Sequence, residues 1–438
     1  MFNEFSTHAI RCKTKNIMIS SCLNVVKIHR IFQITSFKPL VHVQSSQISA
    51  FISTLKLNSL QKFKKHQFST KSSKPPSLFS SLMDLSKARL SALVVLTSVG
   101  GFLAYGPPLN TEMLIACSIG TALCSFSACT FNQVIERKRD AMMYRTKGRP
   151  LPSHRVTLNQ AGTWGVGTGI AGSALLGISL NPIVAGLGLG NIFLYSGIYT
   201  PMKRYSEWNT WIGSVVGAIP PLMGWAAASG GNLMAIEPWI LATLLYLWQF
   251  PHFFSLAWMG RKDYGRADFK MVAVSDKSGE RTGGIIWYHS LALTALPLLC
   301  YLTNTTSGMF LVEGMAINGY LLYLAHQYTS NKKGYSRDKG AKKIFYTSLW
   351  YLPLMMGLYL YHSKRWKEAT FALEARERMR ELCMHETMVD KDSLCPQLVG
   401  EKMEEEVGEK VREGGELIIE TAERAKQQQE DSLSKKMG

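Results

Sequence analysis

Three oxygen-bearing side chains recur at every fourth position of one short stretch, namely Asn132, Glu136 and Asp140. On an α-helix, residues with this spacing lie along one face, drifting by about 40° per step and spanning ~12 Å along the axis. Such carboxylate and amide oxygens are ligands that Mg²⁺ favours. Basic residues interleave with them and follow them: Arg137, Lys138, Arg139, Arg145, Lys147, Arg149 and Arg155. The stretch indicates either a metal–diphosphate site or an ordinary polar helix end with a positive flank.

A second cluster of acids and bases lies later in the chain, in Arg261-Lys262-Asp263-Tyr-Gly-Arg266-Ala-Asp268. Like the first cluster, it follows a long apolar segment. Its carboxylates could hold Mg²⁺ against an anionic substrate, while Arg and Lys side chains bind the remaining oxygens. Basic residues alone would suffice to orient membrane segments. The presence of two such loops therefore favours the metal–diphosphate interpretation over a simple positive flank.

Apolar segments long enough to cross a membrane must position both clusters. We predict nine of them, at about residues 88–106, 112–135, 158–179, 181–200, 209–229, 238–259, 283–303, 307–327 and 344–362. The loops after the second, fourth, sixth and eighth segments are basic, whereas those after the first, third, fifth and seventh contain no Lys or Arg. This alternation is a positive-inside pattern. The expected fold is all-α, a polytopic membrane bundle of about nine transmembrane helices within residues 84–362.

Two polar regions flank this domain, and the net charge of +18 is unevenly distributed between the parts of the chain. In residues 1–83, Glu4 is the one acidic residue among many Lys, Arg, Ser and Thr. This composition is typical of a mitochondrial transit peptide, and a disordered basic tail is the alternative. Residues 363–438 mix acids and bases, which predicts a surface helix or a disordered tail. With the basic loops in the matrix, the N-terminus faces the matrix and the C-terminus the intermembrane space.

The motif Asn132-x-x-x-Glu136-x-x-x-Asp140 resembles the first acidic motif of the UbiA-type intramembrane prenyltransferases. Longer strings are similar to those of the protohaem IX farnesyltransferases within that superfamily: Leu85-Ser-Lys87-x-Arg89-Leu90, Arg145-Thr-Lys-x-Arg149-Pro150, Tyr199-Thr-Pro-Met-Lys203-Arg204, Asn209-Thr-Trp-Ile-Gly213, Gly217-Ala-Ile-Pro220-Pro221-Leu-Met-Gly224-Trp225, Trp248-Gln-Phe-Pro251-His252-Phe253 and Lys262-Asp263-Tyr264. The resemblance covers roughly residues 83–362. One departure is Asp268, where a small residue is frequent in that family, so its part in metal binding stays open.

The resemblance implies a UbiA-type bundle that joins farnesyl diphosphate to a vinyl group of haem b and adds water, giving haem O for haem A and cytochrome c oxidase. It implies Mg²⁺ as the cofactor, with Asn132, Glu136, Asp140 and Asp263 as catalytic metal or diphosphate ligands. The implied phosphate contacts are Arg145, Lys147, Lys203, Arg204 and Lys262, and His252 is the candidate haem contact. The expected surroundings are the lipid bilayer of the mitochondrial inner membrane, with a downstream haem A synthase as a candidate partner and no nucleic acid.

Two other functions compete with this interpretation. The chain could be another UbiA-type enzyme that prenylates an aromatic acid or a quinone precursor, although the Pro-Pro-x-x-Gly-Trp225 and Trp-Gln-x-Pro-His252 strings favour haem as the acceptor. It could also be an anion transporter that uses its basic loops for attraction. A transporter predicts flux without a covalent product, and the sequence contains no evident inverted repeat.

Overall fold

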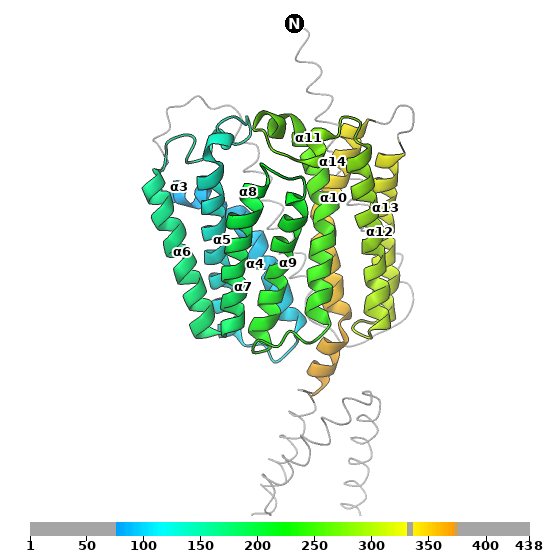
Figure 1. The fold of residues 1–438 in the computed structure, drawn as a ribbon. Helices are drawn as coiled ribbons and strands as arrows, with labels where there is room; N and C mark the ends of the chain where they lie inside the picture. Colours follow the sequence, from blue (N-terminus) through cyan, green and yellow to red (C-terminus); the bar gives the residue numbers. More distant parts are fainter. Residues whose placement is uncertain (1–75, 331–335, 373, 375–438) are drawn as a thin grey trace, which may run out of the picture. The chain divides into compact units, whose positions relative to one another are not determined.

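The computed structural model describes residues 76–330, 336–372 and 374, and these residues form a bundle of helices without any strand (Figure 1). The all-α prediction is therefore confirmed for the described part of the chain. The predicted leader lies almost entirely outside it, as does most of the C-terminal tail. The elements are α3 (Leu78–Leu85), α4 (Ala88–Ala104), α5 (Thr111–Asp140), α6 (Leu158–Ser179), α7 (Pro182–Phe193), the π-helical turn η1 (Leu194–Tyr199), α8 (Thr200–Met202), α9 (Asn209–Ala228), α10 (Glu237–Arg266), α11 (Val272–Ser275), α12 (Glu280–Leu302), α13 (Gly308–Thr329) and α14 (Arg337–His362).

Fewer than nine of the described helical stretches are both long and apolar enough to cross a membrane. Six helical stretches in the described residues are long and apolar enough to cross a membrane, and the bent pair α3 and α4 makes a seventh. Two of the nine predicted segments, α6 and α14, do not meet that criterion. Glycine is only weakly apolar and fills much of α6, while the first turns of α14 carry Arg337, Asp338, Lys339, Lys342 and Lys343. The count of nine stays a prediction.

The break between the third and fourth predicted segments lies where the sequence places it. Helix α6 ends at Ser179, and α7 begins at Pro182. Asn181 is the N-cap, and its side-chain oxygen accepts a hydrogen bond from the Val184 amide at 3.0 Å. Proline is well tolerated at the first helical position because its missing N–H would have no partner there. The Asn-Pro pair thus starts α7 in the orientation that returns the chain toward the cavity described below.

Helices α4 and α9 cross at small residues, and their backbones lie almost in contact. A methyl group added to Gly224 would come closer than 3.0 Å to the carbonyl oxygen of Ser98 and the amide of Phe102. A methyl group added to Gly101 would meet the backbone of Pro221 equally closely. Membrane helices lack a hydrophobic drive toward each other and associate through such close packing. This crossing holds α4 closely against α9.

Helices of the bundle extend beyond residues 84–362 at both ends. The boundary at residue 83 falls inside α3, whose Ser81 and Leu85 are buried. Beyond α14, residues 364–372 are also helical. There the Arg365 side chain donates to the Tyr105 carbonyl at 3.1 Å, and the Trp366 ring donates to the Leu103 carbonyl. The bundle therefore begins before residue 84 and continues past residue 362.

Candidate active site

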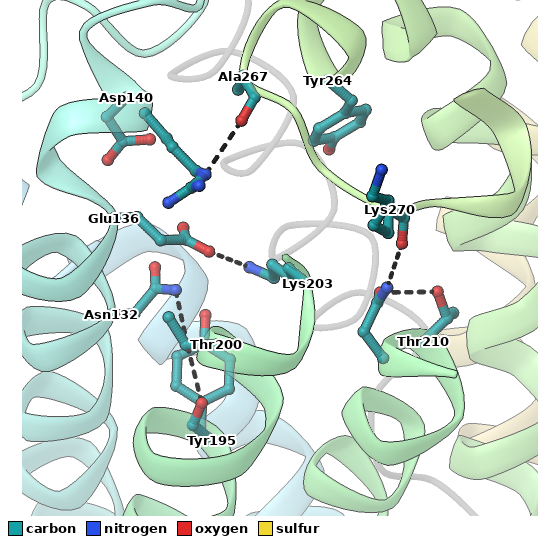
Figure 2. Close-up of polar contacts among 12 residues, drawn as sticks. Asn132, Glu136, Asp140, Tyr195, Thr200, Lys203, Thr210, Tyr264, Ala267 and Lys270 are labelled. Atoms are coloured by element: carbon teal, nitrogen blue, oxygen red, sulfur yellow. Dashed lines mark hydrogen bonds and ion pairs between the residues drawn. The ribbon is translucent and has the colours of Figure 1, made fainter. Parts of the chain in front are cut away.

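One face of α5 carries the side chains of Asn132, Glu136 and Asp140, which we call the oxygen ladder. This ladder lies inside the protein and lines one cavity. Asn132, Glu136 and Asp140 are only 1%, 6% and 0% exposed, although all three are strongly polar. Figure 2 shows the three side chains one above another along α5, facing the segment that carries Thr200 and Lys203. Burying carboxylates is costly unless they are paired. Their shared burial confirms the one-face arrangement that the fourfold spacing predicts.

Each member of the ladder is paired with a cation. The Lys87 ammonium donates to Asn132 Oδ1 at 2.7 Å, and the Lys203 ammonium donates to Glu136 Oε1 at 2.9 Å. The Arg149 guanidinium donates to both carboxylate oxygens of Asp140, at 2.8 and 2.7 Å. Three cations thus face two carboxylates and one neutral amide. The surplus positive charge suits a cavity that receives an anion.

Lys203 is the most deeply buried of these cations, with 9% of its surface exposed. Its ammonium lies 4.4 Å from the centre of the Tyr199 ring, which adds a cation–π attraction. Burial disfavours the charged form, but the Glu136 carboxylate beside it outweighs that effect and holds the pKa of Lys203 above its usual value. Lys203 therefore stays protonated at any physiological pH.

The second acidic loop closes the cavity from the end of α10. The Arg139 side chain donates to the Ala267 carbonyl at 3.0 Å. The Arg145 guanidinium donates to the Tyr264 hydroxyl at 2.9 Å, and the Arg145 amide donates to Asp263 Oδ2 at 3.3 Å. The two clusters that are far apart in the sequence are therefore neighbours in space.

Other predicted site residues lie outside the cavity. Asp263 is at its rim, where Oδ1 accepts from Arg266 at 2.6 Å. Asp268 is exposed at a positive φ of 54°. The side chains of three predicted phosphate contacts also point to the surface: Lys147, Arg204 and Lys262.

His252 faces away from the ladder. Its Nδ1 lies 2.8 Å from Ser348 Oγ of α14, and its ring stacks on Trp248 and Phe345. The next residue, Phe253, lines the cavity instead. Because successive residues of α10 point in different directions, His252 occupies a separate environment between α10 and α14.

Sequence reasoning did not single out Lys87 as a site residue. Lys87 occupies the break between α3 and α4, with a left-handed backbone (φ 47°, ψ 48°), and the two helices meet at 52°. The break is held by Gln133, whose amide donates to the Leu85 carbonyl at 2.6 Å, and by Trp164, which donates to Ser86 Oγ at 2.8 Å. The left-handed turn places the Lys87 ammonium on the oxygen ladder. The one signal in the sequence was its place in a string resembling the family.

The rest of the cavity wall comes from residues that the sequence does not identify as site residues. Arg149 belongs to the basic flank that follows α5, and its pairing with Asp140 becomes visible only in the structure. Aromatic and sulfur-containing side chains complete the lining: Met143, Tyr199, Phe253, Tyr264, Phe269 and Met271. A cavity lined by both charged and apolar side chains can hold a charged head group and exclude water from the atoms beside it.

The donor set fits a Mg²⁺ ion that is bound together with a phosphate group. Among the described residues, no three His, Cys, Asp or Glu side chains converge as a ready-made cage. Mg²⁺ rarely needs one, because it is typically held by one or two carboxylates, substrate phosphate and water. Glu136, Asp140 and Asn132 present oxygen atoms of this kind to the cavity from one helix face.

Comparison with known families decides the classification. The UbiA prenyltransferase family model matches residues 93–366, well over half of the chain. The chain belongs to the UbiA prenyltransferase family. The cavity of this UbiA member is thus formed within the matched region, apart from Lys87, which precedes it.

Three relatives of this UbiA member are named as protoheme IX farnesyltransferases. The chain is 39% identical over 292 residues to a mitochondrial protoheme IX farnesyltransferase of Yarrowia lipolytica and 38% identical over 279 residues to that of Homo sapiens. These matches cover 64% of the chain and 61% of each relative. The protoheme IX farnesyltransferase of Opitutus terrae is 38% identical over 279 residues, covering 64% of the chain and 93% of the relative.

A solved structure has the same fold. A digeranylgeranylglyceryl phosphate synthase superposes with a TM-score of 0.56 at 12% identity, covering 66% of this chain and 99% of that protein. Identity this low supports the shared architecture alone.

Proposed function

We propose that this protein is a protohaem IX farnesyltransferase, which transfers the farnesyl group of farnesyl diphosphate to a vinyl group of haem b and so makes haem O. The observation that carries the proposal is the buried ladder Asn132, Glu136 and Asp140, set against a surplus of cations in an apolar bundle. The activity named for the relatives from yeast, human and bacterium supports haem as the acceptor.

The cavity residues divide the work of releasing diphosphate. Lys87, Arg145, Arg149 and Lys203 line the cavity and bind the oxygens of the diphosphate. The ladder oxygens would hold Mg²⁺, which would supply a positive charge that stabilises the departing group. As the C–O bond breaks, the electron pair leaves with the diphosphate, and the vinyl π electrons form the new C–C bond to the allylic carbon. Water then adds to the resulting cation on haem and loses a proton, giving the hydroxyl group.

The cavity wall protects the allylic cation before haem reacts with it. Phe253, Phe269, Met143 and Met271 form an apolar wall next to the charged groups. Such a wall keeps water from capturing the cation prematurely. The predicted site residues outside the cavity have a supporting role. Lys147, Arg204 and Lys262 attract the anionic diphosphate toward the cavity, and Asp263 attracts its metal cation.

His252 is proposed to contact haem through its free ring nitrogen. The Ser348 hydroxyl donates its one hydrogen to the Phe345 carbonyl at 2.7 Å, so it can only accept from His252 Nδ1–H. His252 Nε2 consequently carries a lone pair. An imidazole fixed in this way is suited to bind iron.

The proposed location is the mitochondrial inner membrane, with the cavity at the matrix side. The basic loops and the predicted transit peptide in residues 1–83 support this orientation, with the N-terminus in the matrix and the C-terminus in the intermembrane space. Farnesyl diphosphate, haem b and lipid are the partners, and a downstream haem A synthase would receive the product.

The decisive experiment is expression of the full chain in a host that lacks its own haem O synthase. We expect haem O to appear in the extracted membrane pigments. Prenylation of an added aromatic acid, with no change in the haem pigments, would instead assign the chain to the quinone-precursor branch. Diphosphate flux into vesicles without any prenylated product would indicate a transporter.

Replacing Lys87 by Met tests the residue that the sequence did not single out. We expect the KM for farnesyl diphosphate to rise by about 10-fold to 100-fold, because a hydrogen bond to a charged group contributes about 1.5–3 kcal/mol. Initial rates of the purified protein in detergent would measure it. Lys342→Met is the matched control, since that side chain is exposed on α14 and does not line the cavity, and its KM should stay within about 2-fold of wild type. Equal effects of the two changes would remove Lys87 from the diphosphate site.

A further inference from the structure

The helix that follows Asn181 contains one turn of π-helix beside the cavity, η1 (Leu194–Tyr199). At its end, the Thr200 amide reaches the Tyr195 carbonyl, five residues back. The Thr200 hydroxyl donates to the same carbonyl, at 2.8 Å. Single π-turns inside helices are rare and frequently occur at functional sites. Here the turn fixes the direction of the Thr200 hydroxyl, which is 1% exposed.

Thr200 and Lys87 together determine which way the Asn132 amide points. The Lys87 ammonium can only donate, so the atom 2.7 Å from it must be the amide oxygen. The hydroxyl hydrogen of Thr200 is used by the Tyr195 carbonyl, so Thr200 Oγ1 accepts from the Asn132 amide nitrogen at 3.0 Å. Both partners require the same orientation. Figure 2 shows the contact between Asn132 and Thr200.

This orientation matters because the two ends of an amide are chemically different. The oxygen can bind a cation, whereas the NH₂ group has no available lone pair and can only donate. Lys87 lines the cavity and can turn toward an incoming diphosphate, which would free the oxygen of Asn132. Thr200 is not part of the cavity lining and keeps its contact on the far side of the amide.

We propose that Thr200 is a positioning residue, which η1 orients so that Asn132 presents its oxygen to the metal–diphosphate complex. The inference rests on the function proposed above. Thr200 acts through Asn132 and touches neither the metal nor the substrate. When a residue that forms a hydrogen bond with a metal ligand is lost, metal affinity or activity typically changes by about 10-fold to 100-fold.

The test compares Thr200→Val, which keeps the side-chain shape without the hydroxyl, with Thr200→Ser, which keeps the hydroxyl. The readout is binding of farnesyl thiodiphosphate, an unreactive analogue, to the full chain in detergent, measured by calorimetry at a series of Mg²⁺ concentrations. We expect Thr200→Val to need about 10-fold more Mg²⁺ for half-maximal binding, and Thr200→Ser to stay within about 2-fold of wild type. Thermal unfolding verifies that each variant is folded, and Thr200→Ala replaces the Val variant if that one is not.

A second pair of variants separates orientation from general packing. In Asn132→Asp, the two carboxylate oxygens are equivalent, so a rotated side chain still presents an oxygen. Thr200→Val in that background should change the Mg²⁺ requirement by no more than about 2-fold. An equal loss in both backgrounds, or no loss in Thr200→Val alone, would overturn the inference. If wild type shows no Mg²⁺-dependent binding of the analogue, the proposed function itself is wrong, and the role of Thr200 is withdrawn with it.

Discussion

Asp140→Asn is expected to lower the rate of prenyl transfer by about 10³-fold while the protein still folds. Asp140 is fully buried at one end of the oxygen ladder. Its carboxylate accepts two hydrogen bonds from Arg149. Asparagine has nearly the same shape but lacks the charge and one acceptor oxygen. Losing several kcal/mol of stabilisation of the departing diphosphate corresponds to a rate loss of this size. Haem O formation by purified protein would measure the effect.

The matched control for this change is Asp268→Asn. Asp268 also follows a basic stretch, but 78% of its side chain is exposed, and it lies outside the cavity. Its removal should alter the rate by less than about 2-fold. Comparable protein levels and thermal unfolding of the two variants would show that the difference arises from chemistry. If a folded Asp140→Asn protein turns over at the wild-type rate, Asp140 is not part of the site.

Gly224→Ala is expected to have the largest effect on folding. The added methyl group would collide with backbone atoms of Ser98 and Phe102, which cannot move aside as a flexible side chain can. Overpacking a well-packed contact usually costs about 1–3 kcal/mol, and a collision with backbone lies at or above the upper end. We expect a lower yield of folded protein and a clear drop in Tm, measured by thermal unfolding in detergent.

Gly190→Ala and Gly162→Ala provide the comparison. Both positions are helical, and a methyl group there meets no other atom within 4 Å. Because alanine favours helix by about 0.5–1 kcal/mol over glycine, these variants should be as stable as wild type or slightly more stable. A Gly224→Ala protein that unfolds at the same temperature as these controls would contradict the close crossing of α4 and α9.

The parts of the site that could be predicted from the sequence are those that depend on local spacing. The fourfold recurrence of Asn132, Glu136 and Asp140 is enough to place them on one helix face, and the Asn181-Pro182 pair is enough to separate two helices. These features depend on residues that are close in the sequence. The helical class follows equally from long apolar segments, although glycine-rich α6 and charged α14 make their number harder to fix than their existence.

The parts that could not be predicted depend on contacts between distant segments. Lys87 reaches the ladder across 45 residues and only because a left-handed residue breaks the first helix. Thr200 reaches it across 68 residues through a π-turn that has no simple sequence signature. Conversely, the phosphate contacts that the family resemblance implies at Lys147, Arg204 and Lys262 fall on exposed side chains. Charge identifies candidates, but the direction of each side chain is set by the tertiary structure.

The contacts of Arg365 and Trp366 with the end of α4 have a consequence for biosynthesis. They join residues that are 260 and 263 positions apart, so the start and the end of the bundle meet there. The ribosome synthesises these residues in order. Helix α4 must therefore remain in the membrane until Arg365 and Trp366 have been made. The carbonyl groups of Leu103 and Tyr105 obtain these partners only then. Completion of the bundle is therefore a late, post-insertion event, and an early stop in translation leaves it open at the end of α4.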